Sequence, residues 1–176
     1  MAIAPDIIKQ LREETGAGVM TCKKILEETK GDLAKAKEVL KKKGVEIAAK
    51  KASRTASQGR IVSYIHHNHK VGVLAEVNCE TDFVAKNEEF ITFCKDLAMH
   101  IVATNPLCVS RQEVSKNDIP EKEAAEDFYK RSCLLEQAFI KDDKVSIGDY
   151  LNSLIAKTGE NIVIRRFVRY SVGEAV

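Results

Sequence analysis

The sequence predicts an α+β fold: an N-terminal bundle of three helices, a linker, and a core in which helices pack with a three-stranded antiparallel sheet. Changes in the apolar period carry this prediction. Residues 5–43 place apolar side chains three and four positions apart, as amphipathic helices do. The period becomes two over residues 61–66 and 71–79, which is typical of strands. A final run at 162–170 is dense in β-branched residues and predicts a third strand.

Local signals divide residues 5–43 into three short helices. Pro5 suits the first turn of the first helix, and Gly16 and Gly18 interrupt the chain before the second. Asp32, a favoured N-cap residue, starts the third. Helices of this length cannot bury their apolar stripes alone, so we expect one compact domain over residues 1–43. The stripes consist of Ile7, Ile8, Leu11, Cys22, Ile25, Leu26, Leu33, Ala36, Val39 and Leu40.

Residues 44–60 are expected to link this bundle to an α+β core over residues 61–176. The linker is basic, small and polar in composition, and a helical stretch is possible within it near Ala48-Ala49. Charge is unevenly divided, because residues 1–60 hold 14 Lys and Arg against 8 Asp and Glu, whereas residues 61–176 hold 14 against 18. A nucleic-acid patch is one interpretation of the basic segment, but no aromatic side chains alternate with its charges for base stacking. We therefore favour a solvated linker.

The four residues from His67 to Lys70 separate the first two strands and predict a hairpin turn. Asn68 tolerates the left-handed backbone that such a turn requires. Three histidines, His66, His67 and His69, crowd this turn. No carboxylate or cysteine lies beside them, so we favour a solvated turn over a metal site.

The helix expected after the second strand is capped by Asn87 and carries negative charge in its first turn. Its apolar stripe consists of Phe90, Phe93, Cys94, Leu97 and Ile101, and Asn105-Pro106 ends it. Beyond it we expect an irregular segment at 107–120, a helix from Ile119-Pro120 to Ala138, and a turn at 141–144. Ser146 to Asp149 fits a capping box that starts another helix, which Gly159 stops. Several strands are apolar on both faces, which predicts burial of one face by a second molecule or domain.

Composition and motifs exclude several function classes. A hydrophobic content of 44% with 31% charged residues is that of a folded soluble protein, and no apolar run approaches the roughly 20 residues of a membrane span. The N-terminus lacks the basic and apolar regions of a signal peptide. Five cysteines without a CxxC pair indicate free thiols in a reducing compartment and no zinc site. We therefore expect a cytoplasmic protein that does not bind a membrane.

No catalytic constellation is present in the sequence. It contains neither of the phosphate-binding patterns GxxxxGKS/T and GxGxxG, and no serine occupies a nucleophile elbow. No base lies near Cys79 to activate its thiol. We expect a protein that acts by binding rather than an enzyme, with no cofactor and no metal of its own.

The segment from Thr81 to Asn87 joins the second strand to a helix and holds a carboxylate directly before an aromatic ring. In one interpretation Asp82 caps a helix and Phe83 fills the core. In the other, the junction presents these side chains to a partner. Phe83 lies outside the apolar stripe of the following helix, which favours the second interpretation.

Three segments, residues 15–24 (TGAGVMTCKK), 77–84 (VNCETDFV) and 160–166 (ENIVIRR), together resemble signatures of the elongation factor Ts family. Members of this family exchange the nucleotide of the translational GTPase elongation factor Tu. The resemblance implies that the N-terminal bundle is a ubiquitin-associated-like module. Because the sequence has no internal repeat, it resembles the short form with one core unit, which implies a homodimer paired through the core sheet.

The resemblance also implies two groups of residues that bind the GTPase. The first group, at the strand-to-helix junction, consists of Thr81, Asp82, Phe83 and Val84. In the family an Asp-Phe pair enters a cleft between helices of the GTPase, so that its Mg²⁺ and phosphate contacts are lost and GDP leaves. Phe83 would be the wedge and Asp82 its orienting partner, with Thr81 and Val84 shaping the turn.

The second group lies in the N-terminal module and would touch the nucleotide domain of the GTPase, while the core grips a second domain. It consists of Arg12, Gly18, Val19 and Met20. Val19 departs from the Met that is usual there. In an alternative interpretation, the Met20 side chain packs inside the helical bundle and does not contact a partner.

Two other function classes remain open from the sequence. An RNA-binding protein that uses residues 41–60 would show an affinity that falls steeply with salt. A helical adaptor that recognises peptides through the bundle would have no effect on nucleotide release. The rate of GDP release from the GTPase, measured with and without this protein, distinguishes both of these classes from an exchange factor.

Overall fold

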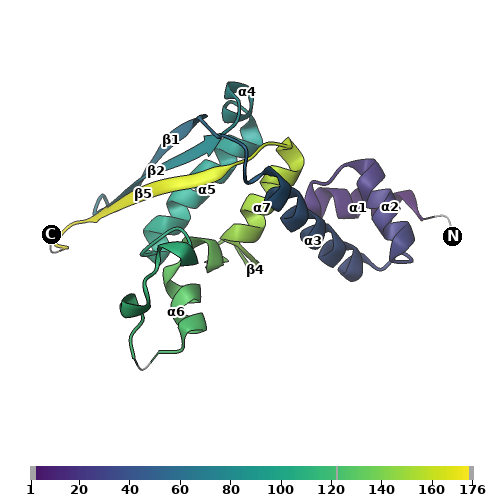
Figure 1. Cartoon of the computed structure of the whole chain (residues 1–176). Helices are drawn as coiled ribbons and strands as arrows, with labels where there is room; N and C mark the ends of the chain where they lie inside the picture. Colours follow the sequence, from purple (N-terminus) through teal and green to yellow (C-terminus); the bar gives the residue numbers. More distant parts are fainter. Residues whose placement is uncertain (1–2, 122, 175–176) are drawn as a thin grey trace. The chain divides into compact units, whose positions relative to one another are not determined.

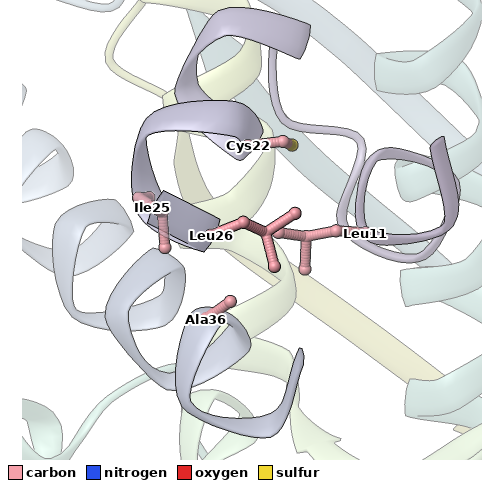
Figure 2. Close-up of a cluster of buried hydrophobic side chains, with 5 residues drawn as sticks. All are labelled: Leu11, Cys22, Ile25, Leu26 and Ala36. Atoms are coloured by element: carbon pink, nitrogen blue, oxygen red, sulfur yellow. The ribbon is translucent and has the colours of Figure 1, made fainter. Parts of the chain in front are cut away.

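The apolar stripes of the N-terminal sequence form three helices, α1 (Pro5–Thr15), α2 (Val19–Glu28) and α3 (Leu33–Lys51). The computed structural model describes residues 3–121 and 123–174. Gly16 ends α1 in the left-handed region, at φ 65°, and the Asp32 carboxylate caps α3 by accepting the Lys35 amide at 3.1 Å. Side chains of all three helices meet in one cluster, in which Leu11 and Leu26 point toward each other (Figure 2). The fully buried members are Leu11, Cys22, Ile25, Leu26 and Ala36.

The helix α3 is longer than expected. The sequence predicted that the bundle ends at Lys41-Lys42-Lys43-Gly44 and that a linker follows. The helix continues to Lys51, with Gly44 buried inside it. The sequence after Gly44 is rich in good helix formers, among them Ala48, Ala49 and Lys50, and one glycine does not outweigh them. The segment from residue 44 to residue 51 is therefore helix, and only the residues between α3 and the first strand are irregular.

The chain divides into two compact units. The first comprises the residues up to Arg54 together with Asn152–Asn161, and the second comprises Thr55–Leu151 and the residues from Ile162 onward. Within the first unit the amide of Asn161 donates to the Arg54 carbonyl at 2.7 Å, which fastens the returning segment to the end of α3. One boundary lies inside α7 (Ile147–Thr158), a helix that the sequence predicted from its capping box. The bonds of that box are present, because Ser146 Oγ accepts the Asp149 amide at 3.0 Å and the Asp149 carboxylate accepts the Ser146 amide at 3.3 Å.

The second unit is built on a three-stranded antiparallel sheet, as predicted. Its strands β1 (Gln58–Ile65), β2 (Val71–Cys79) and β5 (Val163–Ser171) lie in the order β1-β2-β5. The hairpin turn differs from the prediction in one detail, since His69 rather than Asn68 has the positive φ, at 57°. The Asn68 side chain instead accepts the Lys70 amide at 3.0 Å.

The two faces of this sheet have different surroundings. One face packs against α5 (Glu88–Thr104), which lies along it in Figure 1, and its β2 side chains Val73, Ala75, Val77 and Cys79 are buried. The other face carries exposed apolar side chains from all three strands. These are Ile61, Ile65, Leu74, Val163, Val168 and Tyr170. The prediction of strands that are apolar on both faces is therefore confirmed.

The segment between α5 and α7 contains the remaining elements and differs most from prediction. Of the helix predicted from Ile119-Pro120 to Ala138, the described residues form α-helix only in α6 (Ala125–Ser132). Amides of residues 107, 134 and 135 bond to carbonyls of residues 132, 108 and 109, and this pairing ends the helix. The predicted turn at 141–144 contains the start of a strand. The other elements are η1 (Arg111–Glu113), η2 (Lys116–Asp118), η3 (Leu134–Glu136), β3 (Ala138–Phe139) and β4 (Asp142–Ser146).

Candidate partner-binding site

A single helical turn, α4 (Asp82–Ala85), follows β2 at the end of the sheet where β1 begins (Figure 1). Its N-cap is Thr81, whose Oγ1 accepts the Val84 amide at 3.3 Å. The interpretation in which Asp82 is the cap is therefore wrong, because the turn begins one residue earlier. Asp82 occupies the first helical position instead.

Phe83 points out of this turn and is 81% exposed. The interpretation of Phe83 as a core side chain is wrong, since the core aromatics of the same region, Phe90 and Phe93, are fully buried. The free energy falls when another molecule covers an apolar ring that is exposed to water. The exposure that a wedge requires is thus present.

The Asp82 carboxylate is paired within its own turn. Lys86 Nζ lies 2.7 Å from Asp82 Oδ2, four residues away on the same side. The hydrogen bond from Lys86 holds the pKa of Asp82 below its usual value, so Asp82 is ionised at neutral pH. The spacing of four residues between Asp82 and Lys86 is the sequence signal for this pair.

Contacts from the sheet fasten both ends of α4. The Cys79 thiol donates to the Thr81 carbonyl at 3.1 Å, and Arg60 Nη1 donates to the Ala85 carbonyl at 3.2 Å. Ala85 itself is 7% exposed and anchors the turn to the core. Sequence reasoning missed Arg60, because it lies 25 residues upstream and only the pairing of β1 with β2 brings it here.

The N-terminal group of predicted site residues lies in the other unit. Met20 is 75% exposed and Val19 is 47% exposed at the start of α2, so the alternative that Met20 packs inside the bundle is wrong. Gly18 is the N-cap of α2, and its carbonyl accepts the Cys22 amide at 2.9 Å. Arg12 is exposed on α1. Three of the four residues are consecutive and form one apolar edge of the bundle.

The cysteine thiols and the groups that could hold a metal were expected from the sequence to be unreactive and dispersed. All five cysteines are free, and burial raises the pKa of Cys94 to about 12, which keeps that thiol protonated. Across residues 3–121 and 123–174, no three His, Cys, Asp or Glu side chains gather as metal ligands would. In the same part of the chain, no helix combines the length and the apolar character needed to cross a bilayer.

The chain is similar to known proteins along its whole length. The family model described as Elongation factor TS matches residues 2–127 and 122–174. An elongation factor Ts of Caldanaerobacter subterraneus is 46% identical, over 99% of this chain and 98% of the relative. Those of Desulforamulus reducens and Alkaliphilus metalliredigens are each 48% identical, over 99% and 100% of this chain and 91% and 92% of the relatives.

Proposed function

This chain belongs to the elongation factor Ts family of translation elongation factors, and we propose that it is the guanine-nucleotide exchange factor of a translational GTPase of the elongation factor Tu type. The observation that supports this function best is the 81% exposure of Phe83 on a turn fastened at both ends. The protein acts by binding and holds neither nucleotide nor metal of its own. Its place of action is the cytoplasm, where translation supplies the GTPase.

In the proposed mechanism, Phe83 enters a cleft between helices of the GTPase and displaces the side chains that surround it. The Mg²⁺ and phosphate contacts of the bound GDP are lost as a consequence, and GDP leaves. Asp82, ionised and paired with Lys86, orients the turn, while Thr81 and Val84 give it its shape. All four residues belong to one short segment, so they act on one place of the partner.

The N-terminal unit supplies a second contact in this mechanism. The apolar edge at Val19 and Met20, together with Gly18 and the exposed Arg12 of α1, touches the nucleotide domain of the GTPase. A flexible thioether suits a contact that must change as the partner changes shape. The sheet-and-helix core grips a second domain.

Thermodynamic linkage limits how far the factor can weaken GDP binding. If the factor weakens GDP binding, GDP weakens binding of the factor by the same ratio. Each tenfold of weakening requires about 1.4 kcal/mol, and one buried Phe provides roughly 2–3 kcal/mol. Phe83 alone therefore accounts for about a hundredfold, and any larger acceleration comes from the other contacts.

We also propose a homodimer that pairs through the outer face of the sheet. The exposed apolar side chains of that face support it, Leu74 and Val168 lying opposite each other on β2 and β5. A twofold pairing would let each copy cover the apolar face of the other.

The experiment that tests the exchange function follows release of a fluorescent GDP from elongation factor Tu after mixing with excess unlabelled GDP. The protein should accelerate release, and the acceleration should saturate as its concentration rises. An unchanged release rate would contradict the proposal and leave the peptide adaptor and the RNA-binding protein as the remaining classes. Binding to single-stranded RNA that weakens steeply with salt, without any acceleration, would indicate the RNA-binding class.

A further inference from the structure

The turn α4 is too short to keep its shape by itself. It spans four residues, and an isolated helical turn of this length is unstable because its nucleation costs more than its few hydrogen bonds return. The amides of Lys86 and Asn87 close the turn on the carbonyls of residues 82 to 84, at 3.0 to 3.2 Å. The direction of the Phe83 ring therefore depends on what fastens α4 to the rest of the unit.

Arg60 provides the fastening at the C-terminal end of the turn. It pairs with Val77 across the β1–β2 ladder, so its side chain lies on the sheet face that packs against α5. From there Nη1 reaches the Ala85 carbonyl at 3.2 Å. A cationic donor is favoured at this end of a helix, where carbonyl groups point outward, and a hydrogen bond from a charged group is stronger than a neutral one.

The strand β1, which carries Arg60, packs against both α4 and the helix α5 that follows it. The charge of Arg60 acts on the Cys94 thiol of α5 and opposes the larger rise in pKa that burial causes there. Arg60 thus lies where α4, α5 and β1 meet. Its hydrogen bond to the Ala85 carbonyl links β1 to the segment that carries Phe83.

We infer that Arg60 is a positioning residue, which holds α4 in the orientation that lets Phe83 enter the GTPase. The inference rests on the proposed exchange function. It does not place Arg60 in contact with the partner: Arg60 acts through the turn. Arg60→Ala should loosen α4 and leave the sheet intact. Arg60→Lys should loosen α4 less than Arg60→Ala does, because lysine keeps a charged donor group but lacks the reach of the guanidinium fork.

The first measurement uses the protein without its partner. Hydrogen exchange at the Lys86 and Asn87 amides reports whether α4 is closed. Arg60→Ala should speed exchange at both amides by about threefold to tenfold, the range that the net energy of one hydrogen bond corresponds to, and leave the β2 amides unchanged. Equal protection in Arg60→Ala and wild type would overturn the inference. Lys95→Ala, which removes an exposed positive charge from α5, serves as the matched control.

The second measurement follows GDP release as a function of factor concentration. Arg60→Ala should lower the maximal rate by about threefold to tenfold and leave the half-saturating concentration unchanged, because the other contacts still form the complex. In a Phe83→Ala background the same substitution should have little further effect, since the orientation of that ring is what Arg60 secures through the turn. Multiplying effects in the double variant would overturn the inference. If the wild type fails to accelerate GDP release, the proposed function is wrong. The hydrogen-exchange measurement still decides whether Arg60 orders α4.

Discussion

At the scale of single residues, exposure separates the aromatic side chains into two kinds. Phe90 and Phe93 are fully buried in the helix that covers the sheet, whereas Phe83 is 81% exposed a few residues earlier. The sequence predicted this difference, because Phe83 lies outside the apolar stripe. It could not predict the cap, since Thr and Asp are both favoured N-cap residues and only the backbone decides between Thr81 and Asp82.

His100 is a buried residue whose protonation state links stability to pH. It is fully buried on α5, its Nε2 lies 2.9 Å from Gln137 Oε1, and Nδ1 has no hydrogen-bond partner among the described residues. Burial lowers its pKa, and the bond to Gln137 opposes this only partly. The folded protein therefore keeps His100 neutral where the unfolded chain takes up a proton.

Stability should consequently fall as pH drops below about 6.5, the ordinary value for histidine, because the unfolded state then binds more protons. Between about pH 7 and about pH 5.5 the wild type should lose more unfolding free energy than His100→Gln, which takes up no proton in this range. Urea unfolding at both pH values measures it. The exposed His69→Asn is the control, and equal pH dependence in wild type and His100→Gln would contradict the prediction.

At the scale of elements, local signals predicted the helices with strong apolar stripes and clear caps. The helix α5 begins after Asn87 and ends at Asn105, which takes the left-handed conformation before Pro106. In the segment between α5 and α7, hydrogen bonds to residues distant in the sequence determine the structure instead. Leu135 and Ala138 have helical spacing, yet they lie in η3 and β3, because the backbone around them bonds to residues 107–109 and to β4. Helical spacing alone does not reveal such partners.

The N-cap of α5 gives a prediction at this scale. The Asn87 side chain accepts the Glu89 amide at 2.7 Å. Asn87→Ala should lower the unfolding free energy by about 1 kcal/mol, because the amide loses its partner at the helix start. Urea unfolding measures the loss. The exposed Thr92→Ala on the same helix is the matched control, and a loss no greater than in that control would show that the cap contributes nothing.

At the scale of the whole molecule, the outer face of the sheet supports the proposed dimer. Leu74 lies at the middle of this face, opposite Ser63 on β1 and Val168 on β5. From strands that are apolar on both faces, the sequence predicted that a second molecule or domain buries one face, but no residue pattern in it identifies which. In the proposed dimer a second copy would cover this face in a twofold arrangement.

Leu74→Lys tests this pairing, because it places two like charges in the centre of a symmetric interface. At micromolar concentration the wild type should sediment as a dimer and the variant as a single protomer. Lys144→Ala on the exposed strand β4 is the control and should behave as the wild type does. A wild type that sediments only as single protomers would contradict the dimer.

The central claim concerns the Phe83 ring, and the maximal rate of GDP release from elongation factor Tu tests it most directly. Wild type and Phe83→Ala are compared at saturating factor, after circular dichroism has established that both are folded. The account predicts that the variant folds normally and is slower by about a hundredfold, because the ring supplies roughly 2–3 kcal/mol on burial. A folded Phe83→Ala variant that releases GDP as fast as the wild type would contradict it.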